Sequence, residues 1–503
     1  MIHYRIISMI TFLAGICILI FGYFFWSKVA EKIFGPDDRK TPALKNPDAV
    51  ERVPLSRRRN MLIQLLNIAG MGPIVGVVLG MKFGPVVFLI LPIGNVIGGA
   101  IHDYYVGMIS ARNNGSDMTG LVGKFLGRTS GAIFLVLVIL SLLLLVTTFT
   151  NIPANFILLL LPFGPAVLVC AVVGIFVYYI ISTIFPIDKV VGRIYPVFGV
   201  ALILVTALLC FAYIPFASSI PDLVLTPAGI TEAFTAHPGG QPIVPMLFIT
   251  IACGILSGFH ATQSPITSRT ITSEREGRRV FYGMMVAEGI IAMIWAAGAS
   301  IIFTLRPEML ASTNGNAIIF EILDLVFPTF LIVLAILVLI ILAITSGDTA
   351  LRVMRTSVAG HFGFDQSTMR KRILLALPLV AAITLLLLWS NLIPTGYAVL
   401  WNYFSWFNQV IASFALMTAT VYLISKGKPF WITMIPGAGI LFVVISFILW
   451  SSPEHLAGVP FGIGMPLEMS YLVSGALTAA VYFFLVRQGR KLRADAEFSA
   501  DEA

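Results

Sequence analysis

Apolar runs of about 20 residues recur along the whole chain, and each is long enough to cross a bilayer as a helix. The chain has 503 residues, of which 58% are hydrophobic and 11% charged, and its mean hydropathy is +0.96. A soluble domain carries roughly 25% charged residues. The sequence therefore predicts an all-α polytopic membrane protein with about thirteen transmembrane helices. The expected spans are 6–27, 62–81, 84–110, 131–150, 162–184, 193–215, 243–263, 280–305, 318–345, 371–390, 395–424, 429–450 and 465–487.

Two of these runs are interrupted by residues that a continuous helix disfavours. The first contains Gly70-Met-Gly72-Pro73, and the second contains Ser257-Gly258 followed by Pro265. Glycine and proline weaken or break a helix interior. Unwound backbone at membrane depth persists only where protein buries it or where it lines a wet cavity. A pair of interrupted segments in corresponding positions indicates the substrate site of a transporter.

The two breaks divide the chain into two sets of five spans. We expect an N-terminal helix with a basic loop (1–61), a first set (62–215), an extracellular loop (216–242), a second set (243–424), and two further helices with a tail (425–503). Because five is odd, the second set begins on the opposite side of the membrane. The expected core is therefore a five-plus-five inverted repeat of the LeuT-like kind.

The net charge of +8 is distributed unevenly over the loops. If the spans alternate, nearly all Lys and Arg fall on one side, and only Arg5, Lys82 and Arg306 fall on the other. This bias predicts an N-terminus outside and a cytoplasmic C-terminus, in a bacterial-type inner membrane. It also explains the positive charge without a nucleic-acid partner.

The residues around the breaks are the candidates for substrate binding. Half-helix N-termini favour anions such as a carboxylate, so freed amides there would suit a small carboxylate or peptide. The alternative is a tight helix crossing that uses small residues. The candidates are Gly70, Gly72, Pro73, Ser257, Gly258, Phe259, His260, Gln263 and Ser264.

Four titratable residues inside the spans are candidates for coupling to an ion gradient. These are His102, Asp103, Glu288 and Asp348. Ionisable groups in the bilayer core are costly, so each needs a function or a partner. A structural ion pair is the alternative for Asp103, with Arg112 or the cluster of charges in the inner loops as its partner. Asn408 and Gln409 lie in an aromatic-rich helix, whose aromatic residues are expected to pack, with a gate as the alternative.

Enzyme motifs and metal frameworks are not found in the sequence. There is no His-Glu-x-x-His, Gly-x-Ser-x-Gly or Walker motif, so we expect neither an enzyme nor a resident cofactor. The four cysteines lie in apolar runs without CxxC spacing and are expected to be buried free thiols: Cys17, Cys170, Cys210 and Cys253.

Several strings of the chain resemble the carbon starvation protein A family of bacterial peptide and pyruvate uptake transporters. The strings are Thr41-Pro42-Ala43, 68–76, 99–103, 253–265, 274–283 and Ala287-Glu288-Gly289. The resemblance covers roughly residues 40–425. It implies the fold of the amino acid–polyamine–organocation superfamily, with broken first and sixth core helices. One departure is Leu62-Ile-Gln-Leu65, where the family often carries Gly-His-His-Phe.

These observations together predict a secondary active transporter in the lipid bilayer. It would import a small carboxylate or peptide, such as pyruvate or short peptides, with protons as the coupling ion. One alternative is a sodium-coupled symporter that uses Ser346 and Thr349. An alternative of another class is a membrane-embedded enzyme or nutrient sensor.

Overall fold

The computed structural model is helical throughout the residues it describes, which are 9–47, 52–161, 163–184, 187–312, 314–393, 395–456 and 461–501. No strand occurs among them. The helices of the first half are α2 (Ile10–Phe21), α3 (Ser27–Phe34), α4 (Pro42–Lys45), α5 (Arg57–Ile68), α6 (Met71–Gly80), α7 (Val87–Gly94), α8 (Ala100–Arg112), α9 (Met118–Leu126), α10 (Arg128–Leu160), α11 (Pro165–Ile184) and α12 (Ile187–Ala212). The later helices are α13 (Pro227–Thr235), α14 (Phe248–Thr250), α15 (Ala252–Ile255), α16 (Gly258–Ser268), α17 (Gly283–Leu305), α18 (Gly315–Val326), α19 (Thr329–Phe362), α20 (Met369–Leu392), α21 (Gly396–Ser425), α22 (Trp431–Trp450) and α23 (Leu467–Asp501).

The lengths of these helices match a membrane protein. Within the described residues, nine helices are long and apolar enough to cross a bilayer, and the bent pair α5–α6 raises the number to ten. Two shorter apolar stretches, 166–182 and 197–212, lie in α11 and α12. The prediction of an all-α polytopic fold is confirmed, while the total of thirteen spans stays a prediction.

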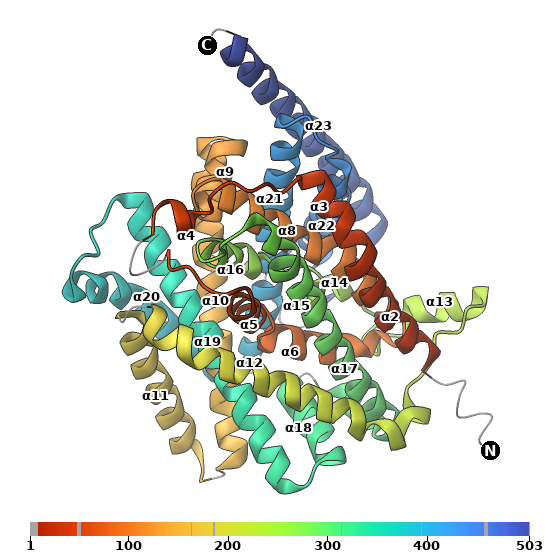
Figure 1. Cartoon of the computed structure of the whole chain (residues 1–503). Helices are drawn as coiled ribbons and strands as arrows, with labels where there is room; N and C mark the ends of the chain where they lie inside the picture. The colour runs from red at the N-terminus through yellow and green to blue at the C-terminus, as the bar shows by residue number, and fades with distance from the viewer. Residues whose placement is uncertain are drawn as a thin grey trace.

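The broken helices lie in the middle of the bundle (Figure 1). The hydrophobic stretches of α17 and α21 are 89% buried, whereas those of α20 and α23 are only 22% buried. Leucines such as Leu374, Leu385 and Leu472 are exposed on these outer helices. Exposed apolar faces of this length fit a lipid environment, because the bilayer replaces the water that such faces avoid.

The two predicted sets of spans meet along their long third helices. Helix α10 packs along α19, the first broken helix (α5–α6) contacts α19, and the second (α14–α16) contacts α21. The arrangement agrees with two related sets, and the inverted repeat itself stays a prediction.

One predicted span is displaced. The sequence predicted a helix over 318–345, but the chain forms α18, breaks at Phe327-Pro328, and restarts as α19. Proline lacks an N–H and disfavours helix in the residue before it, which explains the break. Asp348, expected at the end of a span, therefore lies inside α19.

Burial of the cysteines was predicted correctly at one position. Cys253 is buried, but Cys17, Cys170 and Cys210 are exposed on apolar helix surfaces. A thiol is apolar enough to face lipid, so an apolar run does not by itself indicate burial inside the protein.

Candidate substrate cavity and titratable cluster

The two predicted breaks are present, and they face each other. The axis bends by 48° between α5 and α6, across Ala69 and Gly70. In the second segment α15 ends at Ile255, and Leu256 and Ser257 are extended before α16 begins. Both prolines that follow the breaks lie inside the next half-helix, and Pro73 falls near its start, where the N–H that proline lacks is not needed.

Glycine lets the two segments approach each other closely. A Cβ on Gly72 would lie 2.7 Å from Cys253 Sγ, and one on Gly76 would lie 2.7 Å from the carbonyl oxygen of Thr250. Side chains at these positions would push α6 away from α14 and α15. The small residues therefore allow close packing as well as the break, and the substrate-binding role of these positions stays a prediction.

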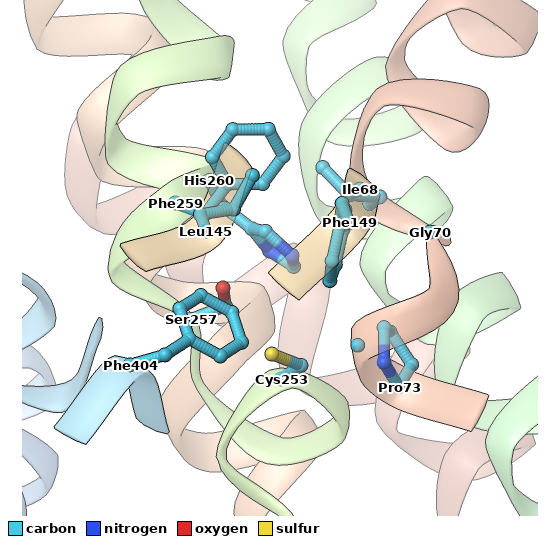
Figure 2. A pocket seen from close by; sticks show the side chains of 11 residues that line it. Ile68, Gly70, Pro73, Leu145, Phe149, Cys253, Ser257, Phe259, His260 and Phe404 are labelled. Carbon is cyan, nitrogen blue, oxygen red and sulfur yellow. The ribbon is translucent and has the colours of Figure 1, made fainter. Parts of the chain in front are cut away.

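A small cavity lies between the breaks (Figure 2). Its volume is about 10 Å³, enough for one water-sized sphere. A molecule larger than water fits here only if wall side chains move. The wall consists of Ile68, Gly70, Gly72, Pro73, Leu145, Phe149, Cys253, Ser257, Phe259, His260 and Phe404.

The polar edge of the cavity continues into a buried cluster of titratable groups. His260 Nδ1 lies 3.1 Å from Asp103 Oδ2, and His260 Nε2 lies 3.7 Å from Glu288 Oε2. Asp103 Oδ1 lies 2.8 Å from His102 Nδ1. These four side chains, which we call the titratable cluster, come from α8, α16 and α17 and are at most 1% exposed.

The cluster joins the cavity to buried proton-binding groups. Both ring nitrogens of His260 face carboxyl groups, while its side chain forms part of the cavity wall. Neither oxygen of Glu288 has a hydrogen-bond partner among the described residues. A charge in the bilayer core is expensive without partners. The cluster therefore places buried titratable side chains directly behind the cavity wall.

The partners predicted for Asp103 as a structural ion pair were wrong. Arg112 instead pairs with Glu274, with Nε–Oε1 and Nη2–Oε2 distances of 2.9 and 2.8 Å. Asp103 lies more than two helical turns from Arg112 on α8, and it is met by His260 from α16. The sequence did not place α16 against α8.

The remaining predicted site residues do not line this cavity. Gly258 packs against α21, and Gln263 donates to Thr262 Oγ1. Ser264 Oγ accepts a hydrogen bond from Gln64 Nε2, which joins α16 to α5. Asp348 Oδ2 accepts one from Ser182 Oγ, at the α11–α19 contact and outside the titratable cluster.

Several wall residues were not predicted. Leu145 and Phe149 come from α10, and Phe404 comes from the aromatic-rich helix, whose aromatic residues were expected to pack, with a gate as the alternative. Apolar residues in an apolar span carry no local signal of facing a cavity. Cys253 was predicted only as a free thiol, although it stands next to Gly254 at the break.

A family model described as "Carbon starvation protein CstA" matches residues 7–215, 173–322 and 313–447. The chain belongs to the carbon starvation protein CstA family. The sequence resemblance is thereby confirmed over most of the chain.

The relatives of this chain include two proteins with transporter names and one uncharacterized membrane protein. A peptide transporter CstA of Campylobacter jejuni is 25% identical over 85% of this chain and 78% of its own length. The pyruvate/proton symporter BtsT of Escherichia coli is 28% identical over 58% of this chain, and the match spans only 48% of BtsT. An uncharacterized membrane protein of Haemophilus influenzae is 38% identical over 58% of this chain and 90% of its own length.

Solved structures show the same fold at low identity. A manganese transporter of Eremococcus coleocola superposes with a TM-score of 0.57 at 15% identity, covering 89% of this chain and 99% of that one. MhsT, in complex with L-phenylalanine, gives a TM-score of 0.54 at 14% identity, covering 86% and 99%. The CstA-family chain thus has a fold of the LeuT kind, as predicted.

Proposed function

We propose that this chain is a secondary active transporter that imports a small carboxylate or peptide together with protons. The observation that carries the proposal is the position of His260. It lines the cavity between the broken helices and reaches Asp103 and Glu288 behind the wall. The names of the CstA relatives support pyruvate or short peptides as the substrate class.

The start of α6 is the proposed seat of the substrate carboxylate. Its N-cap residue is Gly70, which brings no side chain to the first amides of the helix. Gly70, Gly72 and Pro73 all line the cavity. Free amides at a helix N-terminus bind an anion with both hydrogen bonds and the helix dipole.

The titratable cluster is the proposed coupling device. A proton on His260 places a positive charge at the cavity wall, where it favours the substrate carboxylate. With Asp103 and Glu288 both within reach of the ring, the proton can leave the wall after the substrate does. Substrate and proton then stabilise each other's binding, as thermodynamic linkage requires for symport.

Substitution of Glu288 tests the coupling. In proteoliposomes, Glu288→Gln keeps the shape of the side chain and removes its proton-binding site. We expect accumulation driven by a pH gradient to fall more than about tenfold, with substrate exchange at equal pH retained. Asp365→Asn, in an exposed turn with Lys371, serves as the control and leaves both unchanged. Unaltered pH-driven accumulation in Glu288→Gln would remove the cluster from the coupling step.

Sodium coupling is the second candidate, favoured by one contact. A Cβ on Gly70 would lie 2.8 Å from Ser346 Oγ, so this hydroxyl of α19 touches the first break. Ser346 Oγ donates to Leu342 O on its own helix. Varying the sodium and proton gradients separately decides between the two ions, because sodium coupling predicts accumulation at equal pH.

The proposed orientation places the N-terminus outside and the C-terminus in the cytoplasm of a bacterial inner membrane. It is supported by the one-sided distribution of Lys and Arg over the loops. In this orientation α5 and α16 form the cytoplasmic halves of the broken helices, and α6 and α15 form the outer halves.

A further inference from the structure

We propose that Asn408 is a positioning residue that caps the N-terminus of α16 from the neighbouring helix α21. The N-terminus of α6 is then the one that binds the anionic substrate. The inference rests on the proposed function and specifies which of the two breaks binds the substrate. The sequence assigned no role to Asn408, and it predicted freed amides at both breaks.

The amide oxygen of Asn408 occupies the position of a capping ligand. Oδ1 accepts a hydrogen bond of 2.7 Å from the backbone N–H of Phe259 and one of 3.2 Å from Ser257 Oγ. Nδ2 lies 3.4 Å from Cys253 Sγ. Asn408 is fully buried, so these bonds have no competition from bulk water.

The start of α16 depends on this outside cap. Its own N-cap residue, Ser257, makes no side-chain capping bond to the helix among the described residues. The next amide, that of His260, is bonded to the carbonyl of Ser257. A buried N–H without a partner costs about 1–3 kcal/mol, so some group must satisfy Phe259.

Close backbone packing fixes the capped end in place. A Cβ on Gly258 would lie 2.1 Å from the carbonyl oxygen of Asn408 and 2.8 Å from the nitrogen of Ala412. The start of α16 therefore rests directly on α21. This contact sets the positions of the neighbouring residues that form part of the cavity wall, which are Ser257, Phe259 and His260.

The first break has no such cap. Gly70 makes no side-chain capping bond in the described part of the chain, and both Gly70 and Gly72 line the cavity. At the start of α16 the amides of Phe259 and His260 are hydrogen-bonded, whereas no described side chain caps the start of α6, so an anion finds amide donors more readily at α6. Asn408 thus holds His260 in position and directs the carboxylate to the other break.

Kinetics of two Asn408 variants test the inference. The full-length protein is reconstituted in proteoliposomes, and uptake of labelled pyruvate and of labelled alanyl-alanine is measured at pH 5.5 and pH 8. Asn408→Leu keeps the size but removes the acceptor, and Asn408→Asp keeps an acceptor oxygen. Asn402→Leu, on the same helix and outside the cavity wall, is the matched control.

We expect Asn408→Leu to raise KM at least about fivefold relative to the unmodified chain at both pH values, the effect of losing a helix cap. We expect Asn408→Asp to restore KM to within about twofold at pH 5.5, because burial disfavours ionisation of the new carboxyl and the neutral acid imitates the amide. At pH 8 its KM rises, because an ionised carboxylate repels the anionic substrate. Asn402→Leu leaves KM unchanged.

Two results would overturn the inference while leaving the proposed function intact. One is an unchanged KM in Asn408→Leu. The other is an equal loss in the Leu and Asp variants at both pH values, which indicates a merely structural role. Failure of the unmodified chain to accumulate either probe would instead overturn the proposed function, and this inference with it.

Discussion

At the scale of single residues, the packing around the cavity depends on glycines as much as on residues with larger side chains. Gly72 faces Cys253 in the cavity wall, and Gly76 faces the backbone of Thr250. A thiol can rotate away from an added methyl group, whereas a backbone carbonyl cannot. The two glycines should therefore differ in what their replacement costs.

Gly72→Ala should reduce transport without unfolding the protein. Its Cβ would lie 2.7 Å from Cys253 Sγ and would occupy part of a cavity of about 10 Å³. We expect uptake to fall about tenfold and the free energy of unfolding to fall by less than about 1.5 kcal/mol. The double variant Gly72→Ala/Cys253→Ala should recover a large part of the uptake. Equal uptake by the single and double variants would contradict this interpretation.

Residues at the breaks could be predicted from sequence because their types are unusual inside a span. Gly70, Gly72, Ser257 and His260 are all in the cavity wall, as expected. Phe149 and Phe404 could not be predicted, since an aromatic side chain in an apolar helix is equally suited to lipid, packing or a cavity. The link from His260 to Glu288 also needed the structure, because it joins two different helices.

At the scale of elements, side-chain contacts at the two ends of the bundle tie loops to the helices around the cavity. At the end predicted to be cytoplasmic, Glu274 is held by Arg112, by the backbone N–H of Asp37 at 3.1 Å and by Arg39 at 3.6 Å. We call Asp37, Arg39, Arg112 and Glu274 the latch. It joins the segment before α4 to α8 and to the chain that follows α16.

Glu274→Gln should loosen the latch. The Glu274 side chain is 1% exposed and that of Arg112 is 11% exposed, so removing one charge leaves the other poorly compensated. We expect the free energy of unfolding to fall by about 2 kcal/mol and a cytoplasmic thiol reagent to reach Cys253 faster. Asp38→Asn, which breaks the exposed pair with Arg275, is the control and should change neither. Equal free energies of unfolding and equal labelling rates of Cys253 in the two variants would contradict a role for the latch.

At the opposite end, His237 packs its ring against Phe83, with centroids 4.5 Å apart. Burial lowers the pKa of His237 from 6.5 to about 4, and the charge of Lys82 adds to the effect. The folded loop therefore favours neutral His237, and Nδ1 accepts a hydrogen bond from the N–H of Gly239. The stabilisation is complete above pH 6.5 and is lost as pH falls from 6.5 towards 4.

Hydrogen exchange in the loop around α13 tests this pH dependence. We expect protection to be constant above about pH 6.5 and to decline as the solution is acidified. His237→Phe should keep the ring contact and make protection independent of pH in this range. A decline of the same size in His237→Phe would assign the pH dependence to another group.

At the scale of the whole molecule, hydropathy was enough to predict the class of fold. The bilayer restricts the length of a span, the backbone that can cross it and the loops that carry Lys and Arg. Segment length, the two breaks and the charge distribution can therefore be recognised in the sequence. The span predicted over 318–345 was wrong because hydropathy does not detect the break at Phe327-Pro328. The position of Asp348 outside the titratable cluster depends on the packing of α11 on α19, which no local pattern encodes.

The central claim is that the cavity between the two broken helices is where the substrate binds. The rate of Cys253 alkylation tests it most directly, because Cys253 lines the cavity and faces Gly72. The measurement uses a chain whose other cysteines, Cys17, Cys170 and Cys210, are replaced by Ala, with a membrane-permeable maleimide in proteoliposomes. We predict that the transported substrate slows labelling of Cys253 at least about fivefold, with half-protection near its KM for uptake. An unchanged labelling rate at saturating substrate, with uptake intact, would contradict the claim.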